Sequence, residues 1–311
     1  MGGHAEISLE EQIKIKEALL KLGFSDSAFI KSSLVSKEFQ KLYSVYLERG
    51  YHADLQYLEN TKAKFDINSL LPGCNTILAA AHPYIHKDTL DALKSGRYKI
   101  ARYAWGRDYH LTLKSKLKRI FRKHTGLRIV VDSTPLPERY WARLAGLGFI
   151  GRNAMLINKS TGSYFLLAFV LFKAKCEQPQ PENGDLLTIQ NDISLNCGDC
   201  SLCVDACPTG AILPGALIDS NRCISYHTIE SKEKEIMLHS KKHAWIFGCD
   251  ICQSVCPFNK NRVFTLDNDF AARASTIAVA NGMPQVNLNG SPLKRAGVKG
   301  LERNIRYVND F

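Results

Sequence analysis

The chain has 311 residues and an apolar fraction of 45%, so it can bury a core of ordinary size without depending on disulfides. Its longest apolar run, at 164–172, is too short for a bilayer span of about 20 residues, and its charged N-terminus lacks the apolar core of a secretion signal. The net charge of +11 favours a polyanionic partner. We therefore expect a cytoplasmic protein with no membrane association.

The pattern of apolar residues predicts a mixture of helices and buried strands. In chain order, we expect mainly helix over 1–60, a buried strand over 75–81, helices over 88–124 with a loop around 105–108, a short strand over 127–131, a helix over 138–145 and a strand over 164–172. The sequence TPLP follows the short strand and cannot easily continue regular structure. Asp132 is therefore predicted at a strand-to-loop junction.

The positive charge is concentrated in one stretch. From Lys94 to Arg128 there are twelve Lys or Arg and a single acidic residue, Asp108, with aromatic residues between them. This mixture is typical of a nucleic-acid-binding surface. A solvated helix face explains the same charges, because the apolar residues of 111–124 fall on one helical stripe, and charge alone does not decide between the two. A second basic patch, with five positive residues, lies at 294–306.

Ten cysteines are many for a cytosolic chain, and eight of them lie between residues 197 and 256. Cys74 and Cys176 stand apart and are interpreted as small buried apolar residues. A reducing compartment argues against disulfides, so the sequence indicates metal binding for the other eight.

The first cysteine run ends at Pro208 and has the C-x2-C-x2-C-x3-C-P spacing of bacterial ferredoxins, in which the fourth cysteine binds a second cluster. The second run, C-x2-C-x3-C-P, ends at Pro257 and lacks one ligand, which Cys223 supplies. Two zinc sites would also use eight thiolates, but the triple-cysteine loop and the two Cys-Pro endings favour two 4Fe–4S clusters. The expected ligands are Cys197, Cys200, Cys203 and Cys256 for cluster one, and Cys207, Cys223, Cys249 and Cys252 for cluster two.

Two clusters form an electron path, and such a path needs a site elsewhere in the chain that accepts the electrons. Several stretches upstream and downstream of the cysteines resemble the epoxyqueuosine reductases, the cobalamin-dependent enzymes that complete queuosine in tRNA. These stretches are 102–110, 131–153, 197–212, 222–230, 247–259 and 291–304, and they follow the family's order. Reductive dehalogenases share the plan of cobalamin with two clusters and are the alternative. A non-enzymatic iron–sulfur electron-transfer protein that binds nucleic acid is a second alternative.

The resemblance implies an α/β (α+β) fold in three segments. A nitroreductase-like cobalamin-binding domain would occupy 1–180, a ferredoxin-like double 4Fe–4S module 185–265, and a basic tail packed on the core 266–311. The stretch 177–184 is interpreted as a linker between the first two. Many family members carry a C-terminal helical-repeat extension that this sequence lacks, which gives the two basic stretches more weight in holding tRNA.

The resemblance also implies the reaction and its participants. The epoxide of epoxyqueuosine at the tRNA wobble position would be reduced to give queuosine, with electrons passing from the two clusters to cobalamin. The partners would be tRNA carrying epoxyqueuosine and an electron donor that the sequence does not identify, and we expect a monomer.

Asp132 matches the proton donor of the family. An ordinary aspartate is ionised at pH 7, so we expect a desolvated pocket that raises its pKa. Without the resemblance, a turn or cap role explains Asp132 equally well. His110 is not assigned as a cobalt ligand. The positions that match cofactor contacts are Asp108, Tyr109, Gly148, Gly151, Asn158, Ser225 and Gly248.

Overall fold

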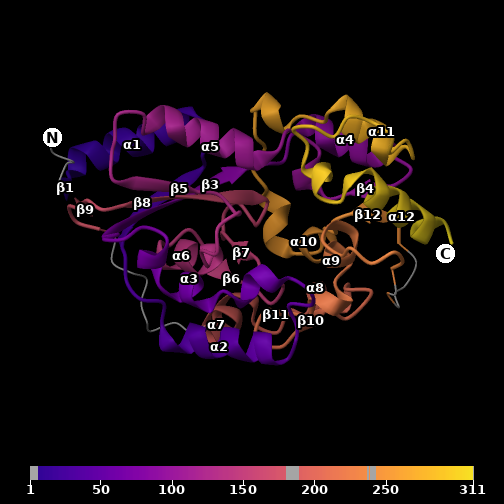
Figure 1. Cartoon of the computed structure of the whole chain (residues 1–311), viewed down its shortest axis with the longest axis horizontal. Helices are drawn as coiled ribbons and strands as arrows, with labels where there is room; N and C mark the ends of the chain where they lie inside the picture. Colours follow the sequence, from indigo (N-terminus) through magenta and orange to yellow (C-terminus); the bar gives the residue numbers. More distant parts are fainter. Residues whose placement is uncertain (1–5, 180–188, 237, 239–242, 311) are drawn as a thin grey trace.

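The structure is a computed structural model that describes residues 6–179, 189–236, 238 and 243–310. Most of the predicted linker at 177–184 lies outside these residues. At the centre is a four-stranded antiparallel sheet with the order β2-β3-β8-β5 (Figure 1). Its strands are β2 (Asp26–Lys31), β3 (Thr76–Pro83), β5 (Leu127–Val130) and β8 (Phe165–Phe172).

The sheet separates two apolar cores. Ile77 and Ala79 of β3 pack into one core, whereas Leu78 and Ala80 pack into the other. Successive side chains of a strand point to opposite faces, so both faces of this sheet are covered. Burial of every residue of β3 explains its uninterrupted apolar sequence, and the predicted buried strands at 75–81 and 164–172 are confirmed.

Helices cover both faces of the sheet. α1 (Leu9–Lys21) and α5 (Tyr109–Ile120) lie on one side, and α6 (Glu138–Leu144) lies on the other (Figure 1). The expectation of mainly helix over 1–60 is wrong for β2, because only three buried apolar residues mark this strand between two helices. The remaining elements of the first half are β1 (Glu6–Ile7), α2 (Lys37–Glu48), α3 (Thr61–Phe65), α4 (Lys87–Ser95), β4 (Lys99–Ile100), β6 (Phe149–Ile150), β7 (Leu156–Ile157) and β9 (Lys175–Cys176).

The cysteine-rich region has short elements, as expected for a segment organised around bound clusters. In chain order these are α7 (Ile189–Asp192), α8 (Leu202–Asp205), β10 (Ile212–Leu213), β11 (Leu217–Ile218), α9 (Ile224–Ile229), β12 (Trp245–Phe247) and α10 (Ile251–Ser254). After them come α11 (Ala274–Ala280) and α12 (Gly297–Asn309). β12 pairs in parallel with β4, which ties this region to the first half of the chain.

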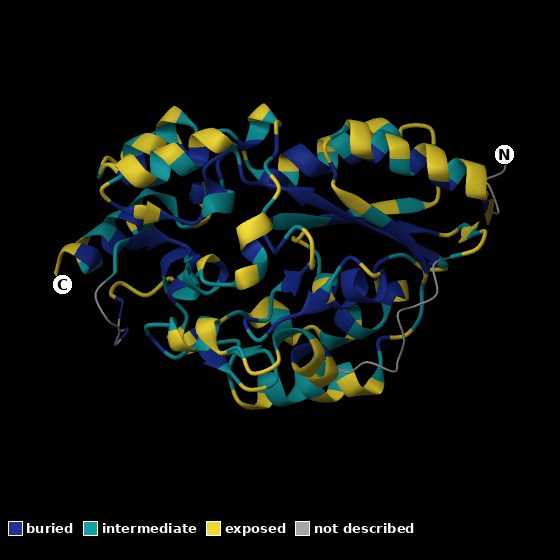
Figure 2. Ribbon diagram, turned by 180° about the vertical axis from the view of Figure 1, so that it is seen from behind, coloured by how far each residue is buried: buried dark blue, intermediate teal, exposed yellow. Residues whose placement is uncertain are grey.

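A third apolar core contains residues from all three predicted segments. Ile100 and Trp105 meet Phe247 of β12 and Leu293 and Leu301 of the C-terminal part. Figure 2 shows buried residues both in the central sheet and in the part of the molecule toward the C-terminus. Within the described residues, no helix has the length and apolar character needed to cross a membrane.

Arg303 and Asn304 join α12 to α9 and β12. Arg303 is buried and its Nη2 donates to the carbonyl oxygen of His227 at 2.7 Å. Asn304 is fully buried, and its Nδ2 donates to the carbonyl oxygens of Thr228 and Ile246, both at 2.8 Å. Arg303 of the basic patch at 294–306 therefore stabilises the fold and is not available to RNA.

We predict that Asn304→Ala lowers the free energy of unfolding by about 2–4 kcal/mol, because it leaves buried carbonyl groups without a donor. Lys299→Ala, at an exposed position of the same helix, is the control and should change stability by less than about 0.5 kcal/mol. The measurement is anaerobic chemical denaturation of the cluster-loaded protein. Equal stability of the two variants would contradict the prediction.

Candidate active site

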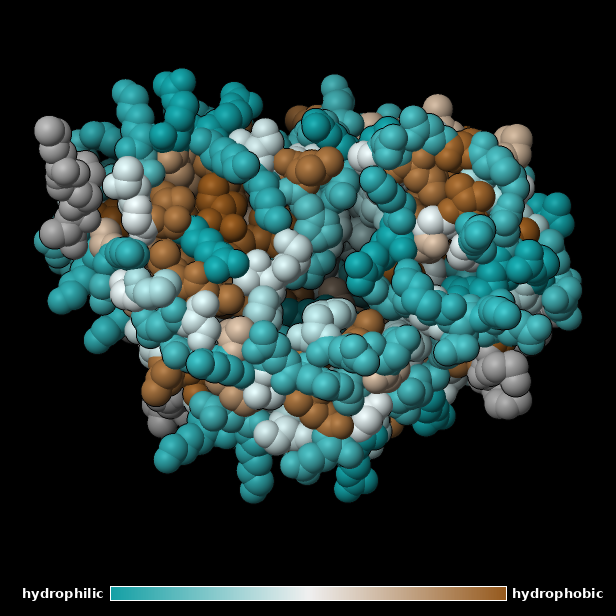
Figure 3. Space-filling view, viewed as in Figure 1, coloured by the Kyte–Doolittle hydropathy of each residue, from teal (hydrophilic) through white to brown (hydrophobic). Residues whose placement is uncertain are grey.

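A cavity of about 1800 Å³ lies between the sheet, α2, α6 and the cysteine-rich region. Figure 3 shows the molecule hollowed near the middle of one face, inside a mostly hydrophilic rim. Pockets for ordinary small ligands have volumes of about 300–1,000 Å³. This cavity is therefore large enough for a macrocyclic cofactor together with part of a second molecule.

Four cysteines line the cavity: Cys207, Cys223, Cys249 and Cys252. They are the four that the sequence assigns to cluster two. Burial, and then the charge of Cys223, raises the pKa of Cys252 to about 12. Such buried thiols become thiolates when metal ions replace their protons, so this wall of the cavity is suited to a cluster.

The other four motif cysteines lie together away from the cavity lining. Burial, and then the neighbouring Cys197, Cys256 and Cys200, raises the pKa of Cys203 to about 11. Cys256 of the second run thus neighbours the cysteines of the first run, in agreement with the predicted crossover. All eight are free thiols. Within the described residues, no three His, Cys, Asp or Glu side chains converge on a point where a single metal ion would bind.

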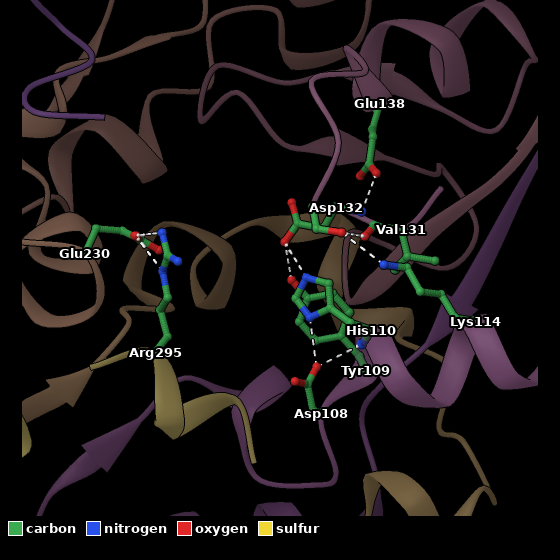
Figure 4. A network of polar contacts seen from close by, with 10 residues as sticks. Asp108, Tyr109, His110, Lys114, Val131, Asp132, Glu138, Glu230 and Arg295 are labelled. Carbon is green, nitrogen blue, oxygen red and sulfur yellow. Dashed lines mark hydrogen bonds and ion pairs between the residues drawn. The ribbon is translucent and has the colours of Figure 1, made fainter. Parts of the chain in front are cut away.

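Asp132 lines the cavity immediately after β5, in a left-handed backbone conformation with a φ of +52°. Its backbone N–H donates to Glu138 Oε1 at 2.6 Å. The Tyr109 hydroxyl donates to Asp132 Oδ2, and His110 Nε2 lies 3.4 Å from the same oxygen (Figure 4). The side chain is 58% exposed, so Tyr109 and His110 hold a carboxylate that a ligand in the cavity can reach.

His110 lies between two carboxylates at the start of α5. Its Nδ1 is 2.8 Å from Asp108 Oδ1, and its ring stacks on Tyr109 with a centroid separation of 4.1 Å. Burial disfavours the imidazolium, but the hydrogen bonds to Asp108 and Asp132 outweigh burial and raise the pKa of His110 to about 9. His110 therefore carries a proton at neutral pH.

The expected rise in the pKa of Asp132 is wrong in direction. Burial acts to raise that pKa, but the hydrogen bonds from His110 and Tyr109 outweigh it and lower the pKa below the usual value. The raised carboxyl pKa belongs to Glu138, where burial and then the charge of Asp132 raise it to about 8. At neutral pH, the protons of this group are therefore held by His110 and Glu138 while Asp132 is ionised.

Three of the seven predicted cofactor-contacting residues line the cavity, namely Asp108, Tyr109 and Ser225. The cavity lining also includes Glu138 and Tyr57, which sequence analysis did not single out. Nothing in the sequence around either residue indicates a functional role. Glu138 begins a helix and resembles any first-turn acid, and Tyr57 lies outside every stretch that resembles the family. Both become candidates only through their neighbours in space.

The other four predicted contacts, Gly148, Gly151, Asn158 and Gly248, do not line the cavity, and local packing accounts for each of them. A β-carbon at Gly148 would lie 2.5 Å from the carbonyl oxygen of Ile157, and one at Gly151 2.4 Å from the Ile157 side chain. Gly248 has a φ of +66°, which favours glycine. The Asn158 side chain accepts hydrogen bonds from the turn that follows it. Cofactor contact at these four positions stays a prediction.

Several cations of the predicted basic stripe hold the fold together. Lys116 Nζ lies 2.7 Å from Asp267 Oδ2 and donates to the Leu22 carbonyl oxygen at 2.7 Å. Arg128 Nη1 donates to the Leu70 carbonyl oxygen at 2.6 Å. None of the basic residues of 111–128 lines the cavity. The basic residues that do are Lys41, Lys64, Arg139, Arg143, Lys294 and Arg295.

The fold and the site together define an iron–sulfur oxidoreductase whose large reaction cavity shares a wall with one of its clusters. Residues 196–259 match the family of 4Fe-4S double cluster binding domains, and residues 64–133 match the family described as epoxyqueuosine reductase QueG, DUF1730. The chain is 36% identical over 310 residues to the epoxyqueuosine reductase of Cyclobacterium marinum, which covers 95% of this chain and 96% of that protein. The chain belongs to the epoxyqueuosine reductase family, and it holds the two 4Fe–4S clusters predicted from its cysteines.

Two solved structures resemble the chain over 96% of its length. One is the Bacillus subtilis epoxyqueuosine reductase with an aspartate catalytic loop swung out of the active site, at a TM-score of 0.76, 25% identity and 81% coverage of that chain. The other is an epoxyqueuosine reductase with a tRNA-Tyr epoxyqueuosine-modified stem loop, at a TM-score of 0.75, 25% identity and 80% coverage of that chain. The predicted α/β fold is confirmed.

We predict that Cys256→Ala damages cluster one although Cys256 belongs to the second run. Anaerobically reconstituted wild type should hold about eight irons, and the variant should lose up to about half of them. Cysteine-to-alanine variants of Cys200 and Cys252 provide references for damage to cluster one and cluster two, and Cys176→Ala is the control outside the motifs. Electron paramagnetic resonance of the reduced proteins is the measurement. A spectrum of Cys256→Ala that matches Cys252→Ala would contradict the crossover.

Proposed function

We propose that this chain reduces the epoxide of epoxyqueuosine in tRNA to give queuosine. The observation that carries the proposal is the single cavity lined both by the cluster-two cysteines and by Asp132 with its hydrogen-bonded partners. Membership of the epoxyqueuosine reductase family supports it. The reductive dehalogenase alternative is not favoured, because the relatives that match across the chain are epoxyqueuosine reductases.

Cobalamin fits the chemistry of this cavity. The volume of about 1800 Å³ admits a corrin ring, and Ser225 and Tyr109 of the lining would hold it beside the cluster-two cysteines. Bound there, cobalamin would supply a low-valent cobalt centre able to pass electrons to the epoxide. The four cysteines of cluster two would bring those electrons to the cavity wall.

The two clusters differ in exposure, which gives the electron path a direction. Gly198, Asp199 and Leu202, between the cluster-one cysteines, are exposed, whereas the cluster-two cysteines line the cavity. An external donor would therefore reduce cluster one at the surface, and electrons would pass through cluster two to the cavity. The identity of that donor stays open.

Conversion of an epoxide to an alkene and water consumes two electrons and two protons. The ring oxygen leaves far more readily as a hydroxyl than as an alkoxide, so an acid must be positioned beside it. Asp132 is ionised at neutral pH, and the protonated His110 is hydrogen-bonded to it. In this mechanism His110 supplies a proton through Asp132, Tyr109 orients the carboxylate, and Glu138 holds the Asp132 backbone.

We predict that Asp132→Asn lowers turnover about a hundredfold or more, the usual scale for loss of a general acid. The measurement is single-turnover conversion of epoxyqueuosine in tRNA with cobalamin reduced beforehand, so that electron delivery does not limit the rate. Cluster content, cobalamin binding and tRNA binding of the variant should match those of wild type. A variant that converts the substrate at nearly the wild-type rate would contradict the role of Asp132 in proton delivery.

We predict that the single-turnover rate falls as pH rises through about 9, because His110 holds its proton below its raised pKa and loses it above. His110→Gln should be slower at neutral pH and should lack this decline. His124→Gln, in the turn that follows α5, is the control and should keep the wild-type profile. The same decline near pH 9 in His110→Gln would assign it to another group.

A further inference from the structure

Tyr57 is an exposed aromatic side chain in the cavity lining. Among the described lining residues it is the one large apolar or aromatic side chain that is strongly exposed, at 57%. It has no ring-stacking or hydrogen-bond partner within the part of the chain that the structure describes. The Tyr57 ring is therefore available to stack on a molecule in the cavity.

The backbone that carries Tyr57 is nevertheless fixed from two sides. The Tyr43 hydroxyl of α2 donates to the Leu58 carbonyl oxygen at 2.7 Å. The Tyr226 hydroxyl of α9 donates to Asp54 Oδ1 at 2.5 Å. The segment is thus held between the first half of the chain and the cysteine-rich region, and it presents a free ring on a fixed support.

Tyr57 lines the same cavity as Asp132, Glu230 and Arg295. Burial, and then the charges of Glu230 and Asp132, raises the pKa of Tyr57 to about 12, and the nearby Arg295 acts in the opposite direction. A molecule that enters the cavity and reaches Asp132 is therefore in a space that Tyr57 also lines.

Arg295 stands beside the same space with one nitrogen free. Its Nε and Nη2 donate to Glu230 Oε2 at 2.8 and 2.6 Å, which fixes the plane of the guanidinium. Nη1 has no partner among the described residues, and the side chain is 57% exposed. Figure 4 shows this pair across an open space from the Asp132 carboxylate. The exposed Lys41 and Lys294 add positive charge to the same lining.

We propose that Tyr57 and Arg295 form the recognition site for the modified nucleotide, with Tyr57 stacked on the face of the base and Arg295 donating from Nη1 to an acceptor of the nucleotide. The inference rests on the proposed function and adds the residues that select the substrate. Bases of single-stranded RNA loops are commonly recognised by stacking on aromatic rings and on arginine planes. The exposed cations of α5 do not line the cavity, so they would at most contact distant phosphates.

The test measures stem-loop binding separately from turnover. Two RNA stem loops of identical sequence, one with epoxyqueuosine and one with guanosine at the wobble position, are titrated anaerobically into the cobalamin- and cluster-loaded protein. Tyr57→Ala should weaken binding of the modified stem loop about tenfold or more, the scale for loss of one stacked base, and should reduce the preference for it. Tyr57→Phe keeps the ring and should retain both.

Arg295→Ala should also weaken binding of the modified stem loop, whereas Lys118→Ala, an exposed cation of α5, should reduce the affinity for both stem loops equally and slightly. Unchanged discrimination in Tyr57→Ala would overturn the recognition site. Loss of cobalamin uptake with stem-loop binding retained would also overturn it and would make Tyr57 part of the cofactor wall. A wild type that binds the modified stem loop selectively but never converts it would overturn the proposed function and leave the recognition site supported.

Discussion

The structure depends on burying four thiol groups in the wall of a cavity that must also accept a substrate. Burial raises the pKa of Cys252, so its thiol stays protonated until a metal ion replaces the proton. The cysteines come from separate runs, and the short α8 and α10 helices that carry the runs contact each other. The pairing of β12 with β4 and the Arg303–Asn304 contacts then fix this region against the sheet domain.

The second constraint is electrostatic and concerns the group around Asp132. A carboxylate that accepts hydrogen bonds from Tyr109 and His110 is a weaker base than a free aspartate, although protein atoms surround it. The proton is held one hydrogen bond away on His110, and Glu138 supplies a second protonated group. In the proposed mechanism, the proton donor for the leaving oxygen consists of several residues acting together, and Asp132 is the member that ligands can reach.

Positive charge in this protein has two separate uses. Lys116 and Arg303 neutralise or donate to buried groups and stabilise packing, whereas Lys41, Lys294 and Arg295 line the cavity. The two kinds are adjacent in the sequence and cannot be distinguished by counting charges. This difference moves the expected RNA contact from the middle of α5 toward the mouth of the cavity.

The sequence by itself determined the presence of two 4Fe–4S clusters, the buried strands and the family, because cysteine spacing and apolar runs are local patterns that follow directly from the chemistry of clusters and sheets. It placed Asp132 correctly at the end of a strand but gave the wrong direction for its pKa. That direction depends on donors from α5, and the close packing at Gly148 and Gly248 depends on Ile157 and Ala101, which are distant from these glycines in the sequence or lie on another element. Only the tertiary structure decided these points, because a pKa and a cavity lining are set by neighbours in space that no local pattern specifies.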